Sequence, residues 1–253
     1  MLIKEFDSYM RLGTEYYEAL RPHPPQDAYE FYRTYVAKAK GPVLEPMCGS
    51  GRFLLPLLNE GFEVHGFDAS IHMLDALKFK ATQQKLSPNI WQGLIENLNS
   101  NSKYSLIFIP SGSFGHLIEF EVIQRALQVL YEHLDDEGVL LFEVENSRCI
   151  SGALGVWRED VCHRVDGSMI LVKRFLSMKE DVATSIDKYE LIQANQIIRT
   201  EVETLKVRFY DSLNKLTDII KSIGFKDVHL FKAFNKRLKP SDSDSSMVFE
   251  CVK

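Results

Sequence analysis

The residues best suited to chemistry are two acids and two glycines between positions 45 and 68. Glu45 follows an apolar pair, Gly49 and Gly51 come next, and Asp68 closes a second stretch that is typical of a strand. Glycines in such a turn let the backbone adopt a positive φ angle or pass close to a ligand. An acid about 20 residues further on is where a ribose hydroxyl pair is held. The spacing therefore predicts the nucleotide-binding corner of an α/β sheet.

The same spacing separates the candidate ligands. A dinucleotide fingerprint needs a third small residue three positions after Gly51, and Leu54 stands there. A phosphate loop needs lysine and then serine or threonine after the glycine, and Arg52 and Phe53 follow Gly51 instead. An adenosine ligand without a pyrophosphate is therefore favoured. An NAD-dependent Rossmann oxidoreductase remains the alternative.

With these two motifs the chain resembles the class I S-adenosylmethionine-dependent methyltransferases. The resemblance implies that Glu45 organises the turn at the methionine end of S-adenosyl-L-methionine, that the backbone of Gly49 and Gly51 lies against that end, and that Asp68 binds the ribose hydroxyls. Met47 departs from the family, which commonly has a glycine there. Other residues that the resemblance places at the cofactor are Tyr17, Met47, Arg52, Ala69, Ser70, Met73 and Pro110.

A third motif, at residues 93–98, corresponds to the family's adenine loop. Leu94 stands where the family has an aspartate, so the usual partner of the adenine amine is missing. Gln92, Glu96 or a backbone carbonyl is expected to replace it, and Ile95 is expected to stack on the ring and to offer its backbone N–H.

The segment 111–117 follows the predicted fourth strand and should face the transferred methyl group, because ligands bind beyond the carboxyl ends of such strands. Ser111, Ser113 and Phe114 are expected to contact the acceptor, and His116 to orient it or take its proton. In related small-molecule N-methyltransferases a Gly-His-Leu sequence lies here. Packing or helix capping is the alternative for His116. Tyr16 is a further candidate acceptor contact.

Strands are expected to begin at 43 and to span 63–68, 89–92, 104–110 and 139–145, with Asp135–Gly138 as a turn before the last. Helices are expected at 27–40, 53–58, 71–84, 120–134 and 213–223. Strand-like runs follow at 169–175, 183–194 and 197–210, and then at 225–234 and 247–252. Runs of strands without intervening helices predict antiparallel pairing.

The expected fold is α/β: a doubly wound, seven-stranded Rossmann-like sheet with an antiparallel C-terminal hairpin, plus an inserted antiparallel β-sheet. The expected parts are an N-terminal helical lid (1–42), a cofactor-binding core (43–145), the insert (146–211) and a final helix and hairpin (212–253). By resemblance to sugar-amine and glycine N-methyltransferases, the insert caps the acceptor pocket or forms a homodimer contact.

The composition limits the classes of function. The 253 residues carry a net charge of −5, which disfavours a nucleic-acid partner held by phosphate contacts. Four scattered cysteines form no metal-binding spacing and indicate free thiols in a cytoplasmic protein. No run is apolar enough to predict a membrane span or export signal.

The sequence thus predicts an S-adenosylmethionine-dependent methyltransferase that acts on an N or O atom of a small molecule and releases S-adenosyl-L-homocysteine. The alternatives are a protein or RNA methyltransferase, a non-catalytic cofactor-binding or assembly protein, and the NAD-dependent oxidoreductase.

Overall fold

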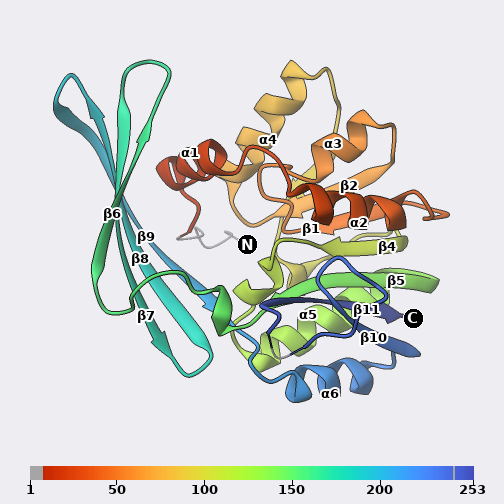
Figure 1. Ribbon diagram of the computed structural model, residues 1–253. Helices are drawn as coiled ribbons and strands as arrows, with labels where there is room; N and C mark the ends of the chain where they lie inside the picture. The colour runs from red at the N-terminus through yellow and green to blue at the C-terminus, as the bar shows by residue number, and fades with distance from the viewer. Residues whose placement is uncertain (1–7, 242) are drawn as a thin grey trace.

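The computed structural model describes residues 8–241 and 243–253. The first seven residues of the predicted lid therefore lie outside the described part of the chain. The main feature of the structure is a seven-stranded sheet in the order β10-β11-β5-β4-β1-β2-β3 (Figure 1). Neighbours among β1 to β5 run parallel, and β11 is antiparallel to both β5 and β10. The expected sheet with a C-terminal hairpin is confirmed.

The elements alternate along the chain as a doubly wound fold requires. The strands of this sheet are β1 (Val43–Pro46), β2 (Val64–Asp68), β3 (Asn89–Gln92), β4 (Tyr104–Ile109), β5 (Leu134–Glu145), β10 (Asp227–Lys232) and β11 (Ser246–Val252). The α-helices are α1 (Arg11–Leu20), α2 (Gln26–Val36), α3 (Leu54–Asn59), α4 (Ile71–Gln83), α5 (Phe120–His133) and α6 (Asn214–Ile223). The 3₁₀ turns are η1 (Ile95–Asn97), η2 (Ser113–His116) and η3 (Ser147–Cys149).

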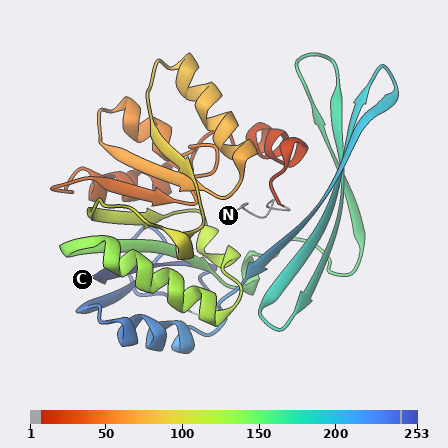
Figure 2. The ribbon, with the colours of Figure 1, turned by 180° about the vertical axis from the view of Figure 1, so that it is seen from behind.

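The sheet is buried on both faces. Helices α2, α3 and α4 lie on one side of the sheet and α5 and α6 on the other (Figure 2). Leu106 and Phe108 of β4 pack against the first group, and Ile107 and Ile109 pack against the second. All four side chains are at most 2% exposed, as expected for a central parallel strand. The apolar run that predicted this strand therefore reflects helices on both faces of the sheet.

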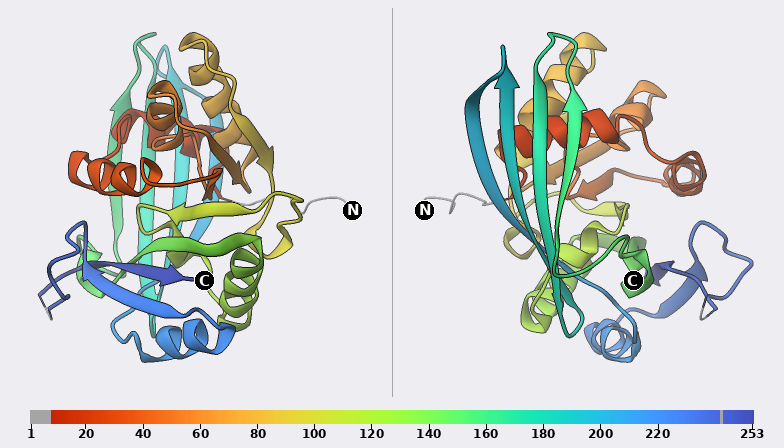
Figure 3. Two further views of the ribbon diagram at one scale, coloured as in Figure 1. Left: turned by 90° about the vertical axis from the view of Figure 1, so that its right-hand side faces the viewer. Right: turned by 60° about the vertical axis from the view of Figure 1, so that its left-hand side comes forward.

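A second, four-stranded antiparallel sheet stands apart from the first (Figure 3). Its strands are β6 (Trp157–His163), β7 (Met169–Lys179), β8 (Val182–Gln193) and β9 (Gln196–Arg208). This is the predicted inserted sheet. Its inner face packs on α1 through Ile170, Val172 and Tyr189, which form a small core with Leu12 and Tyr16.

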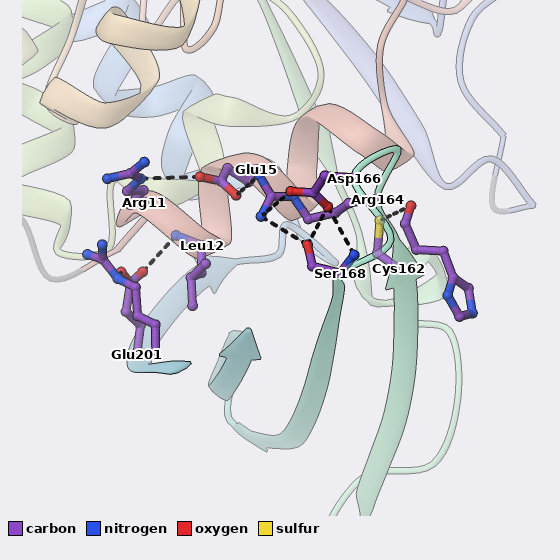
Figure 4. Close-up of polar contacts among 10 residues, drawn as sticks. Arg11, Leu12, Glu15, Cys162, Arg164, Asp166, Ser168 and Glu201 are labelled. Atoms are coloured by element: carbon purple, nitrogen blue, oxygen red, sulfur yellow. Dashed lines mark hydrogen bonds and ion pairs between the residues drawn. The ribbon is translucent and has the colours of Figure 1, made fainter. Parts of the chain in front are cut away.

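Helix α1, which the sequence analysis did not predict, is fastened to this insert. Its backbone N–H at Leu12 donates to Oε2 of Glu201 at 2.7 Å, and Glu15 forms an ion pair with Arg164 (Figure 4). The N–H of Met10 donates to Glu203 at 2.7 Å. Carboxylates are well placed here, because the first N–H groups of a helix have no partner within the helix.

The expected turn at Asp135–Gly138 is wrong as a strand boundary. Strand β5 already begins at Leu134, which pairs with Tyr104. The register then shifts, so that Leu106 pairs with Val139 and the intervening residues bulge outward. Glu137 adopts a φ of 62°, the left-handed conformation that the turn-like sequence had signalled.

None of the described helices has the length and apolarity needed to cross a membrane. The described residues contain no group of three His, Cys, Asp or Glu side chains suited to a metal ion. All four cysteines, which lie in the described part, are free thiols. The cytoplasmic location and the division of the chain at residues 42, 145 and 211 stay predictions.

Candidate cofactor and acceptor site

A cavity of about 530 Å³ lies at the carboxyl ends of β1, β2 and β4. Strands β2 and β3 follow on one side of β1, and the chain then crosses over to β4 on the other side, so this is the point where the strand order reverses. Such a switch point is where open α/β sheets bind ligands. The predicted site residues that line the cavity are Tyr17, Glu45, Met47, Gly49, Arg52, Asp68, Ala69, Met73, Leu94, Ile95, Glu96, Pro110, Ser111, Ser113 and His116.

Glu45 on β1 brings a buried carboxylate to the cavity. The residue is 2% exposed, and its Oε2 has no hydrogen-bond partner in the described chain. Burial first, and the nearby Asp68 second, raise the pKa of Glu45 well above its usual range. A buried oxygen without a partner is costly, so it indicates a donor supplied by a ligand. The ammonium group of a bound methionine end would satisfy it.

The glycine turn after β1 is fixed by Asp68. One carboxylate oxygen accepts from the N–H of Gly49 and the other from the N–H of Ser70, both at 2.8 Å. Met47 adopts a φ of 58°, so it takes the left-handed conformation that the family commonly assigns to glycine. Met47 therefore has a backbone conformation that is unfavourable for a residue with a Cβ. Burial raises the pKa of Asp68, and these N–H groups lower it.

Two residues expected at the cofactor lie behind the turn instead. A Cβ on Gly51 would come within 2.8 Å of Leu77, so this glycine is required for packing against α4. Ser70 caps α4 by accepting from the N–H of Met73, and its hydroxyl donates to the carbonyl of Tyr9 at 2.7 Å. Neither Gly51 nor Ser70 lines the cavity. The geometry therefore does not support the direct contacts with the ligand that were predicted for Gly51 and Ser70.

The predicted adenine end of the cavity is formed by Leu94, Ile95 and Glu96. Gln92 is excluded as a replacement for the missing aspartate, because its amide donates to the carbonyl of Ala69 at 2.9 Å and does not line the cavity. Of the side chains proposed to replace it, Glu96 is the one that reaches the cavity.

The acceptor loop, residues 110–117, lines the same cavity with Ser111, Ser113 and His116. Phe114 does not reach the cavity, contrary to expectation. Its ring is fully buried and stacks on Phe142 with 4.3 Å between ring centroids. The pattern of polar and apolar residues in this loop did not reveal that its middle turns down into the core.

The state of His116 follows from its neighbours. Its Nδ1 lies 3.1 Å from the carbonyl oxygen of Lys206 on β9. A carbonyl only accepts, so Nδ1 carries the hydrogen and the lone pair is on Nε2. Burial lowers the pKa of His116 below its ordinary value, which favours the neutral ring. The insert thus fixes the tautomer that a proton-accepting histidine needs.

Of the two N-terminal tyrosines predicted to lie at the site, one lines the cavity and the other does not. Tyr17 lines the cavity, next to Arg52, whose Nε donates to the carbonyl of His23 at 2.7 Å. Tyr16 points to the insert, where its hydroxyl donates to Asp160 at 2.5 Å, so its expected contact with the acceptor is not supported.

Sequence reasoning missed Ser8 and Tyr9, which line the cavity. The Tyr9 ring lies edge-on to the rings of Tyr17 and His116, 6.0 Å from each. The position of Tyr9 depends on its backbone φ of 52° and on a hydrogen bond that its N–H donates to Glu203 at 2.9 Å. No local pattern signals a partner so distant in the chain. Other lining residues that were not predicted are Cys48, Phe53, Phe67, Gly93, Leu117, Ile118, Glu119 and Val122.

The site therefore fits S-adenosyl-L-methionine. Glu45, with its unpaired carboxylate oxygen, lines one cavity together with Asp68, the predicted ribose-binding residue, and three residues of the acceptor loop. This sheet order and site define a class I S-adenosylmethionine-dependent methyltransferase fold. Residues 43–138 match the family model described as a methyltransferase domain.

Comparisons with individual proteins also find methyltransferases. A protein of Geobacillus sp. (strain WCH70), inferred to be a methyltransferase, is 28% identical over 137 residues, which are 52% of this chain and 56% of that protein. The alignments thus span about half the length of the curated relatives that the chain matches, at 56% and 53%.

Two solved structures share the fold over nearly the whole chain. An S-adenosylmethionine-dependent methyltransferase from Clostridium acetobutylicum ATCC 824 gives a TM-score of 0.76 at 17% identity, covering 94% of this chain and 96% of that one. The sugar N-methyltransferase KedS8 from Streptoalloteichus sp ATCC 53650 gives 0.73 at 17% identity, covering 94% and 92%. At these identities the likeness concerns the fold alone.

Proposed function

We propose that this protein transfers the methyl group of S-adenosyl-L-methionine to an N or O atom of a small-molecule acceptor. The observation that carries the proposal is that Glu45 and Asp68 line the same cavity as Ser111, Ser113 and His116. The residues predicted to hold the donor and those predicted to hold the acceptor thus share one cavity, as direct transfer between the two reactants requires.

The cofactor supplies a methyl group already activated by its sulfonium, so the protein mainly holds the two reactants in line. Glu45 and Asp68 orient the donor. Ser111 and Ser113 offer hydroxyl groups to the acceptor, and Nε2 of His116 accepts a proton from it. A neutral amine acceptor can react without that base, whereas a hydroxyl benefits more from it.

The charge of the cavity supports an amine-bearing acceptor as the first to test. Its lining includes the acids Glu45, Asp68, Glu96 and Glu119, with Arg52 as the one permanently cationic side chain. An acidic cavity favours cations such as a protonated amine, which must release a proton, for example to Nε2 of His116, before its nitrogen can attack the methyl group. KedS8, which shares the fold, is a sugar N-methyltransferase, so amino sugars are the class that we propose.

Two experiments test this function. Calorimetric titration with S-adenosyl-L-methionine, S-adenosyl-L-homocysteine and NAD should show binding of the first two in the micromolar range and none of NAD. Radiolabelled methyl transfer should then be measured with matched amino and hydroxy sugars. Binding of NAD alone would overturn the proposal. Binding without transfer to any acceptor, protein and RNA included, would favour a non-catalytic cofactor-binding protein.

We also propose that a second copy of this chain covers the outer face of the insert. That face exposes Trp157, Val161, Ile186 and Val202, from β6, β8 and β9. On the same face lies an ion pair between Lys173 and Glu159. A surface that carries apolar groups and both signs of charge is suited to a self-complementary, two-fold contact.

A further inference from the structure

The acceptor loop begins with an unfavourable backbone conformation. Ser111 and Gly112 are both left-handed, with φ of 61° and 65°. Glycine adopts this conformation freely, but serine has a Cβ and does not. Such a turn persists only where its surroundings hold it, and here it determines where Ser111, Ser113 and His116 meet the cavity.

The group that holds this turn is Glu143 of β5. Its Oε2 accepts from the backbone N–H of Ser111 at 2.8 Å, and its Oε1 accepts from the hydroxyl of Ser246 at 2.5 Å. The side chain is 5% exposed and does not line the cavity. Both carboxylate oxygens are therefore used within the protein, and one of them holds the first residue of the turn.

The rest of the loop is held by other means. Phe114 fixes the middle by stacking on Phe142, and His116 fixes the end through the carbonyl of Lys206. A Cβ on Gly112 would lie 2.8 Å from Cδ of Glu145, so the turn is packed closely against that side chain. Glu143 is thus the anchor at the start of the loop.

We propose that Glu143 is a positioning residue for methyl transfer, which sets the acceptor loop relative to the cofactor by holding the left-handed turn at Ser111. The inference rests on the proposed function, in which this loop faces the acceptor. Glutamine at position 143 can keep both contacts, because its amide oxygen accepts from Ser111 and its amide nitrogen donates to Ser246. Alanine can keep neither.

The experiment compares Glu143→Ala, Glu143→Gln and the wild type with S-adenosyl-L-homocysteine as the probe. Hydrogen exchange of the peptide covering 110–117 should become about tenfold faster or more in the alanine variant, since the hydrogen bond that holds the turn is lost. The ¹⁵N resonances of the His116 ring, identified by their loss in His116→Asn, should shift as well. The glutamine variant should keep wild-type exchange and resonances, and all three proteins should bind the probe within about threefold.

Val144→Ala is the matched control, because Val144 is the neighbouring residue of β5 and is 1% exposed. This variant should be less stable, but hydrogen exchange in residues 110–117 should not become faster than exchange in β5. The proposal is overturned if Glu143→Ala leaves the loop and the His116 resonances unchanged, or if Val144→Ala reproduces its effects. A wild type that does not bind S-adenosyl-L-homocysteine would instead remove the proposed function, and this inference with it.

Discussion

Asp68 combines two tasks in one carboxylate. It fixes the turn through the N–H groups of Gly49 and Ser70, and it lines the cavity where a ribose is expected. We expect Asp68→Asn to weaken binding of S-adenosyl-L-homocysteine by about tenfold or more, because the amide cannot accept the same set of hydrogen bonds. Calorimetry measures this. Asp75→Asn, an exposed acid on α4, is the control, and equal affinity in both variants would contradict the ribose role.

His116 should affect turnover more than binding. We expect His116→Ala to lower kcat by about 10²-fold or more with a hydroxyl acceptor, because a positioned base is lost. Affinity for S-adenosyl-L-homocysteine should change little. Burial lowers the pKa of His116, so the wild-type rate should fall only when the pH drops below the ordinary histidine range. Steady-state kinetics across pH would show this, and wild-type turnover in the variant would leave His116 as a packing residue.

Glu143 makes folding stability depend on pH. Burial raises its pKa from 4.5 to about 7, so between these values the folded state binds more protons than the unfolded state. The stability contribution of Glu143 is therefore complete below about pH 4.5 and is lost as pH rises through 7. From pH 5 to pH 8, wild type should lose on the order of 2–3 kcal/mol relative to Glu143→Gln. Urea unfolding at both pH values tests this, and a constant difference would contradict it.

At the scale of elements, the fastening of α1 to the insert explains a glycine inside a helix. Replacing a glycine inside a helix, such as Gly13, by alanine ordinarily stabilises the protein by up to about 1 kcal/mol. Here a Cβ would lie 2.3 Å from Oε1 of Glu203, the carboxylate that binds the N–H groups of Tyr9 and Met10. We therefore expect Gly13→Ala to lower the melting temperature, and Glu203→Ala to abolish that penalty in the double variant. An increase in melting temperature for Gly13→Ala alone would show that Glu203 is not held there.

At the scale of the whole molecule, the outer face of the insert should decide the oligomeric state. Trp157 is 58% exposed, and Phe79 on α4 is 66% exposed. Sedimentation analysis should find the wild type as a dimer at micromolar concentration and Trp157→Glu shifted toward monomer, because a charge replaces the apolar contact. Phe79→Glu should remain dimeric. A monomeric wild type, or a dimer insensitive to Trp157→Glu, would refute the proposed contact.

Local patterns alone located the centre of the site. Glu45, Gly49 and Asp68 lie at the carboxyl ends of β1 and β2, and parallel strands place such ends at one edge of the sheet. The order of strands and helices followed from apolar runs and turn residues, so the fold was predicted as well. Each of these inferences depends on residues close together in the chain.

Tertiary structure decided which neighbours of that centre reach the cavity. Tyr9 lies in it and Tyr16 does not, because Glu203 and Asp160 of the insert, more than 140 positions away, accept from these two residues. Phe114 turns inward because Phe142 is there to stack on it. Contacts between distant segments form only once the sheet and its insert are assembled. The sequence therefore determined the predicted centre of the cofactor site, and the fold determined which other residues line the cavity.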